Sequence, residues 1–317
     1  MRRLFPKVSD RNVIAKHSSG VSTLIYIHRG YSWYVPLALA NGRRFGGHVC
    51  YLGDAFGCRI ARKFGATTAR IGDFAATSRA FEPFYRHHST LGVEFERQCI
   101  SRWFILRDYM KAVDLKSAIY LDTDILATTP LDPFQEQTRH YGMTFTGYSA
   151  HCCFINDVAV LDMFCDFVTE VYSDLVWDVR LRDWERHMLS AAGAGGVSDM
   201  TLFQWFHQRH PELLGSYDDI FQDSPIDLSL AETAGWKATE QGFKYLLWDD
   251  GGPAAIREDG TPVKLAALHH QGTAKLLMRA NARKLGDLTS RRELALRFWD
   301  LTFRAARKIR ANSTKSR

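Results

Sequence analysis

The chain has 317 residues, of which 46% are hydrophobic and 13% aromatic, so it can bury a large core and is not an intrinsically disordered protein. Its formal net charge of +6 suits an anionic small ligand or an anionic membrane surface, whereas nucleic-acid binding requires more than bulk charge. The apolar runs are shorter than the roughly 20 residues of a spanning helix, and no apolar stretch follows the N-terminal basic residues, so we expect no secretion signal and a soluble or peripheral protein.

The first third of the chain alternates between strand-like and helix-like segments. We expect strands at 22–27, 48–52 and around 69–71, and helices at 32–41, 55–64 and 92–112. Such alternation predicts an α/β fold in which helices flank a mostly parallel, mixed sheet. The apolar residues of the 92–112 helix repeat every three or four positions, which indicates that most of them belong to the core.

A short apolar run at 118–127 contains Asp122-Thr123-Asp124 and reads as a buried strand. Two carboxylates one residue apart at the end of a strand would point into the crevice where open α/β sheets bind ligands. Hard divalent cations prefer such oxygen ligands beside phosphate oxygens. The alternative is a plain turn, because aspartate is common in turns that follow strands.

Further along, 151–156 is a second candidate for a buried strand, and two helices follow it. Ser198 or Asp199 is a plausible N-cap for the helix after the glycine-rich break at 191–196. Six cysteines without a paired CxxC motif indicate reduced core thiols and a reducing, cytoplasmic compartment more than disulfides or a zinc site.

A second motif, His269-x-x-Gly272-x-x-Lys275, ends another apolar run. Each residue type has a use beside a metal and a diphosphate. An imidazole can be a metal ligand, glycine permits close approach of the backbone, and an ammonium group balances the charge of phosphate oxygens.

The two motifs together, in this order, resemble those of nucleotide-sugar glycosyltransferases of the GT-A fold, and are most similar to the retaining family-eight type that includes glycogenin and bacterial lipooligosaccharide galactosyltransferases. The resemblance extends from about Val21 to Lys275. It implies a GT-A domain over 20–285, followed by a basic C-terminal helix and tail at 286–317.

The resemblance implies that Asp122, Asp124 and His269 hold Mn²⁺ or Mg²⁺, while Gly272 and Lys275 meet the diphosphate of the donor. It further implies a sugar transferred from a nucleotide-sugar donor, which we expect to carry uridine diphosphate. The acceptor would be a glycan, a lipid-linked molecule or another hydroxyl compound, as in bacterial surface polysaccharide synthesis.

By the same resemblance, Ile27, His28 and Tyr31 belong to the loop that seats the nucleotide base, with Tyr31 stacked on uracil. Arg102 matches a helix arginine that reaches the donor, and Asp199 matches an acid that binds donor sugar hydroxyls.

An inverting enzyme would also need a base for the acceptor proton, for which Asp199 and His151 are the candidates, whereas a retaining enzyme could use the leaving phosphate. The chain departs from the family at Leu276-Leu277, where Pro-Trp is usual, and at 149–151, where Asn-Ala-Gly is usual. The stereochemistry and the donor sugar are therefore left open.

Three other readings are kept. A phosphohydrolase of the haloacid dehalogenase type also has Asp-x-Asp after a strand, although Leu126 occupies a position where threonine or valine is normal there. A non-catalytic nucleotide-binding protein of the same fold and, on charge alone, a nucleic-acid binder are the others.

The segment 290–310 combines apolar and basic residues. It fits an amphipathic helix on anionic lipid, or a helix packed on the domain with a solvated basic face.

Overall fold

The structure is a computed structural model and describes residues 22–30, 32–45, 47–221, 223–289 and 293. The expectations for Tyr31 and for the 290–310 segment therefore lie outside the described residues, apart from Glu293. Within the described part of the chain, no helix is both long and apolar enough to cross a bilayer.

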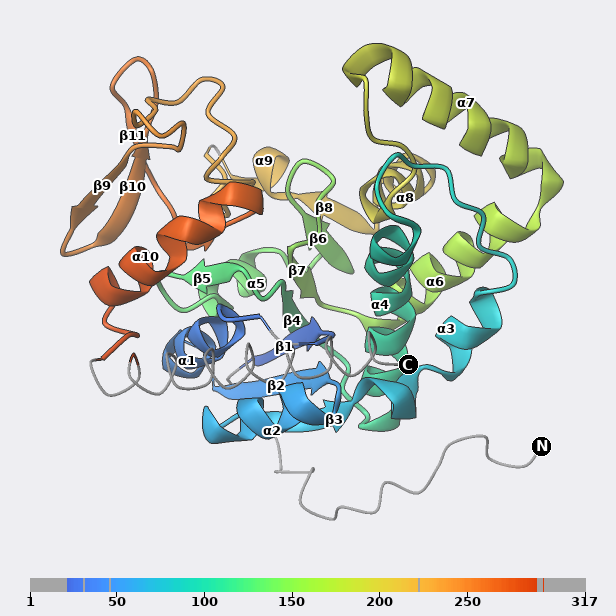
Figure 1. The fold of residues 1–317 in the computed structure, drawn as a ribbon, viewed down its shortest axis with the longest axis horizontal. Helices are drawn as coiled ribbons and strands as arrows, with labels where there is room; N and C mark the ends of the chain where they lie inside the picture. The colour runs from blue at the N-terminus through green and yellow to red at the C-terminus, as the bar shows by residue number, and fades with distance from the viewer. Residues whose placement is uncertain (1–21, 31, 46, 222, 290–292, 294–317) are drawn as a thin grey trace, which may run out of the picture.

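A seven-stranded mixed sheet with the strand order β3-β2-β1-β4-β7-β6-β8 forms the centre of the molecule (Figure 1). Its strands are β1 (Thr23–His28), β2 (His48–Gly53), β3 (Thr67–Arg70), β4 (Ala118–Leu121), β6 (Met143–Phe145), β7 (Cys152–Ile155) and β8 (Leu214–Ser216). Strands β3, β2, β1 and β4 are parallel, β7 runs antiparallel to both neighbours, and β6 and β8 are parallel. The predicted α/β class with a mostly parallel mixed sheet is confirmed.

Helices cover both faces of this sheet because side chains alternate along each buried strand. Ile25 of β1 belongs to the core beneath α4, α6 and α8, whereas Leu24 and Tyr26 belong to the core beneath α1, α2 and α10. These helices are α1 (Val35–Phe45), α2 (Ala55–Lys63), α4 (Val93–Ala112), α6 (Val158–Ser173), α8 (Asp199–Arg209) and α10 (Met278–Lys284). All six cysteines are free, and all but Cys99 are buried, as predicted.

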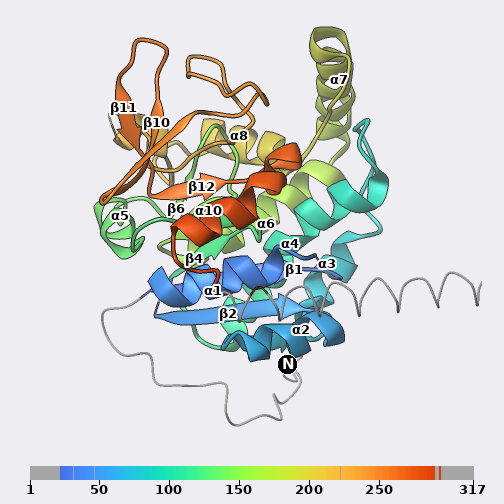
Figure 2. The same cartoon turned by 60° about the vertical axis from the view of Figure 1, so that its left-hand side comes forward.

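Smaller elements complete the fold. They are the helices α3 (Ala76–Phe81), α5 (Asp132–Gln137), α7 (Leu175–Ala192) and α9 (Tyr217–Ile220), the 3₁₀ helices η1 (Ile71–Phe74) and η2 (Gly272–Leu277), the antiparallel sheet of β9 (Leu246–Asp249), β10 (Gly252–Ile256) and β11 (Pro262–Lys264), and the pair β5 (Ile125–Ala127) and β12 (Ala267–His269). The three-stranded sheet and α7 project from different sides of the body in both views (Figure 1, Figure 2).

The expected strand at 118–127 is two strands. β4 ends at Leu121, and β5 begins at Ile125 and leaves the central sheet to pair with β12. The two acids therefore lie in the turn between strands and not at the end of one longer strand. Most other predicted elements begin and end within a few residues of the observed bounds. Ser198, one of the two N-cap candidates, is the N-cap of α8.

The domain boundary that we expected at residue 286 does not mark the end of packing. Asp287 is 1% exposed, and its carboxylate accepts a hydrogen bond from the Asn41 side chain of α1 at 2.7 Å. Leu288 is part of the same core as α1. The first residues of the predicted extension thus belong to the domain.

Candidate metal and nucleotide site

The site lies at the point in the sheet where the order of strand addition reverses. From β1 the chain adds β2 and then β3 on one side, and β4 then pairs with the other side of β1. The carboxyl ends of β1 and β4 therefore leave a crevice between them, which is the usual ligand position in open α/β sheets. His28 ends β1, and Asp122 follows β4.

Pairing of β5 with β12 brings the two sequence motifs together. The register places Ile125 opposite His269, and the His270 amide donates to the Asp124 carbonyl at 2.9 Å. As a result, Nε2 of His269 lies 3.7 Å from Oδ1 of Asp124. Residues far apart in the sequence thus meet through one short antiparallel ladder.

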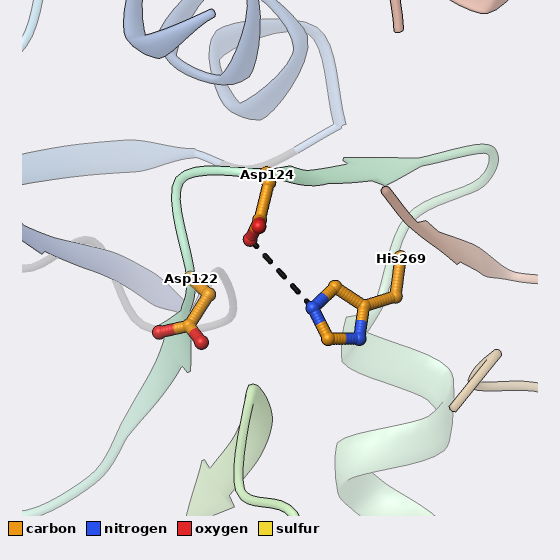
Figure 3. A group of neighbouring side chains, drawn as sticks. All are labelled: Asp122, Asp124 and His269. Carbon is orange, nitrogen blue, oxygen red and sulfur yellow. Dashed lines mark ion pairs between the residues drawn. The ribbon is translucent and has the colours of Figure 1, made fainter. Parts of the chain in front are cut away.

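Asp122, Asp124 and His269 form a cluster that fits one divalent ion. One ligand atom from each residue lies within 4.8 Å of the other two, and the three side chains converge from the β4–β5 turn and from β12 (Figure 3). Opposite ligands of an octahedral Mg²⁺ ion are roughly 4.2 Å apart, so small side-chain movements would place all three on one ion. Carboxylate oxygens are the ligands that Mg²⁺ and Mn²⁺ prefer.

The environment of His269 sets its tautomer for this role. Its Nδ1 lies 2.6 Å from the carbonyl oxygen of Leu228, which can only accept, so Nδ1 carries the proton. In the neutral ring, the form that binds a metal, the lone pair is then on Nε2, the nitrogen that faces Asp124. A backbone carbonyl behind a histidine ligand orients the ring and raises its basicity.

A buried ion pair supports the backbone of His269. Lys244 Nζ lies 2.6 Å from Asp227 Oδ1, and the His269 amide donates to Asp227 Oδ2 at 3.3 Å. Burial raises the pKa of Asp227, and the charge of Lys244 opposes that rise. Sequence reasoning missed this pair, because nothing in the local sequence connects either residue to the histidine motif.

His151 lies behind the wall of the cavity, where its Nδ1 is 2.9 Å from the hydroxyl of Ser149, a residue of that wall. It is 1% exposed and is not among the side chains that line the cavity. Its ring stacks on that of His269 at a centroid distance of 4.1 Å, and its Nε2 donates to the Asp227 carbonyl at 3.0 Å. Burial, followed by the proximity of His269, lowers the pKa of His151 well below its usual value. The ring thus packs behind His269, and its role as a base stays a prediction.

Lys275 and Gly272 lie beside the acids, as their motif predicts. Lys275 Nζ is 2.6 Å from Asp124 Oδ2 and 5.4 Å from the centre of the Tyr34 ring. Burial tends to raise the pKa of Asp124, but the charges of His269 and Lys275 outweigh it and hold that pKa below its usual value. Gly272 has φ of +57°, so its place in the motif reflects a left-handed backbone at the start of η2.

Arg102 of α4 joins Asp122 to Asp199. Its guanidinium lies 2.7 Å from Asp122 Oδ1 and 2.6 Å from Asp199 Oδ2, which also accepts from Trp103 Nε1 at 3.1 Å. Asp122 also accepts from the Tyr120 hydroxyl. Burial raises the pKa of Asp122 despite Arg102, so a cation at this point would relieve the cost of its charge.

At the end of β1, Ile27 and His28 line the cavity. The two nitrogens of His28 lie 3.0 Å from the hydroxyls of Thr123 and Ser32, and burial lowers the pKa of His28 to about 4. The ring is therefore neutral near pH 7. It links the β1 loop to the turn that carries the two acids.

The metal cluster and the donor-binding candidates border one cavity of about 720 Å³, a size suited to a small ligand such as a nucleotide sugar. The predicted residues on its wall are Ile27, His28, Arg102, Asp122, Asp124, Asp199, His269, Gly272 and Lys275. Tyr34 and Glu96 also border it and were missed. Tyr34 could have been noticed because it is an aromatic residue in the loop after β1, whereas Glu96 resembles any acid in the first turn of a helix.

Comparison with known proteins adds no assignment, since no family model matches the chain and no curated protein matches it. Two carboxylates and an imidazole can hold a divalent ion, and an ammonium group and glycine backbone beside them can accommodate an anion.

Proposed function

We propose that the chain is a metal-dependent glycosyltransferase of the GT-A type, which transfers a sugar from a nucleotide-sugar donor to a hydroxyl acceptor. The observation that carries the proposal is the convergence of Asp122, Asp124 and His269 beside Lys275 on the wall of one cavity. A nucleoside diphosphate bridging a divalent ion and a lysine would satisfy every one of these groups. A uridine diphosphate donor is the first expectation.

Negative charge develops on the departing diphosphate as the sugar bond breaks. Mn²⁺ or Mg²⁺ held by the three ligands would supply Lewis-acid stabilisation of that charge. Lys275 would add a fixed positive charge, and the backbone at Gly272 would lie close to the phosphate oxygens. The hydrogen bond from His269 to the Leu228 carbonyl keeps the imidazole oriented throughout.

Asp199 is positioned for contact with the donor sugar or the acceptor. It borders the cavity, and its Oδ2 is held by Arg102 and Trp103. Analysis of the anomeric configuration of the product would distinguish a base role, which inversion requires, from a role limited to binding sugar hydroxyls. The acceptor under this proposal is a glycan or a lipid-linked molecule met at the cytoplasmic side of a membrane.

The test is release of free nucleoside diphosphate from a panel of uridine, guanosine, adenosine and cytidine nucleotide sugars, with Mn²⁺, with Mg²⁺ and with a chelator. We expect turnover of at least one uridine donor and its loss on chelation. Asp114→Asn is a matched control for Asp124→Asn, because the Asp114 side chain is 84% exposed.

Metal-independent turnover would overturn the assigned role of the cluster. Hydrolysis of a simple phosphomonoester with no turnover of any nucleotide sugar would instead favour a phosphohydrolase. Nucleotide binding without any turnover would favour a non-catalytic protein of this fold.

A further inference from the structure

The wall of the cavity changes character away from the metal cluster. On the side formed by α4, α7 and α8, the lining includes Leu91, Phe95, Met188 and Met200, and we call this part the α4–α8 side. Phe95 is 59% exposed, Leu91 48% and Met200 39%. Single exposed apolar side chains are normal, but several that face the same cavity indicate a surface that contacts a ligand.

Glu96 lies among these apolar groups, in the first turn of α4. It is 2% exposed, and its Oε1 accepts a hydrogen bond from the Ser89 hydroxyl at 3.1 Å. Its Oε2 has no hydrogen-bond partner in the described part of the chain. Buried carboxylate oxygens are rarely left in this state, because each one loses its hydration without compensation.

The charges around Glu96 do not supply the missing partner. Asp199 repels its negative charge, and Arg102 attracts it while bound to two other acids. Burial, followed by the charge of Asp199, raises the pKa of Glu96 to about 7. Tyr85, Cys99 and Tyr172 are further titratable groups near it. A neutral ligand with a hydroxyl group would complete the environment, because a hydroxyl can donate to the carboxylate or accept from its protonated form.

We propose that the α4–α8 side is the acceptor subsite, where Oε2 of Glu96 binds a hydroxyl of the acceptor and Phe95 packs against an apolar face of it. This inference rests on the proposed function, since a donor held by the metal cluster and Lys275 would leave the apolar part of the cavity for the acceptor. A pyranose ring has the required chemistry, with hydroxyls at its edge and C–H groups on its faces. Cavities that combine apolar walls with a few placed polar groups bind such ligands.

The proposal is tested with Glu96→Gln and Phe95→Ala, using methyl glycosides as probe acceptors. Glu94→Gln is the matched control, because Glu94 is in the same turn of α4 but its side chain is 69% exposed. In Glu96→Gln, the KM for the methyl glycoside should rise about tenfold, as expected for loss of a hydrogen bond to a charged group. The KM for the donor should rise far less. Phe95→Ala should likewise raise the KM for the methyl glycoside much more than the KM for the donor. Glu94→Gln should change neither constant.

An unaltered acceptor KM in both variants would overturn the inference, as would an equal rise in donor and acceptor KM, which would place Glu96 on the donor side. Saturation-transfer NMR with the methyl glycosides separates this inference from the proposed function, because it needs no turnover. Binding that is weakened in Glu96→Gln, but not in Glu94→Gln, supports the subsite even if every nucleotide sugar proves inert. Binding that is equal in wild type and Glu96→Gln refutes the subsite even if donor turnover is confirmed.

Discussion

Replacement of Glu96 by glutamine should make the protein more stable at alkaline pH, and the size of the effect follows from the burial of this carboxyl. Its pKa is raised from 4.5 to about 7 in the folded protein, chiefly by loss of hydration and then by the charge of Asp199. A raised pKa means that the folded protein holds this proton more tightly than the unfolded chain does. The contribution of the group to stability is therefore complete below pH 4.5 and is lost as the pH rises through 7.

The magnitude can be worked from the shift. From pH 5.5 to pH 8, the wild-type protein loses the part of this stabilisation that corresponds to about 1.5 units of the pKa shift. This equals about 2 kcal/mol in the free energy of unfolding. Solvent in the open cavity screens part of this, so a change of about 1 kcal/mol is the lower expectation. Glutamine has nearly the same shape but cannot ionise, so the variant lacks this pH-dependent loss.

The assay is urea denaturation of wild type, Glu96→Gln and Glu94→Gln at both pH values. The stability of Glu96→Gln relative to wild type should increase by about 1 to 2 kcal/mol from pH 5.5 to pH 8. The exposed control should show no such trend. If the difference between Glu96→Gln and wild type were the same at both pH values, the carboxyl would titrate normally and the argument from its burial would fail.

Three further predictions concern the site and its support. Asp124→Asn should leave the fold intact but abolish metal-dependent turnover and weaken Mn²⁺ binding measured by calorimetry, because the amide keeps the shape and loses the charge; undiminished Mn²⁺ binding would contradict the metal assignment. Gly272→Ala should cost about 1 kcal/mol of stability by thermal denaturation, because alanine is strained at φ of +57°; an unchanged melting temperature would show that the turn relaxes easily. Lys244→Met should cost about 3 kcal/mol or more, measured in urea at pH 7, because it leaves Asp227 buried without its 2.6 Å partner. A loss below 1 kcal/mol in that variant would show that water reaches the carboxylate.

Local patterns in the sequence predicted the main strands and helices of the first half of the chain, but not the sheet of β9, β10 and β11. The alternation of apolar runs with periodic segments predicted β1, β2, α2 and α4 near their observed ends. A helix that buries one face, or a strand that is wholly buried, needs a regular pattern of apolar residues along its own segment. The same reasoning identified the two acids after β4 and the histidine motif that begins at the last residue of β12. These are properties of contiguous segments, and a single sequence can display them.

Only the tertiary structure decided how those segments meet. The pairing of Ile125 with His269 joins two short strands whose sequences carry no sign of their register, and it is this pairing that places the imidazole beside Asp124. His151 faces inward for the same kind of reason. It lies just before β7, and its ring stacks on that of His269, which comes from a distant part of the chain.

The burial of Glu96 is the clearest case of a property that the sequence alone could not predict. In the sequence it is one of two acids in the first turn of a helix, where carboxylates are favoured by the helix dipole and normally face water. Its neighbour Glu94 does so, but Glu96 is buried beside the segment that precedes α4, where Ser89 forms an isolated bridge with Gly196 of the α7–α8 loop. Burial depends on what other parts of the chain lie over a residue, and that information exists only once the chain has folded.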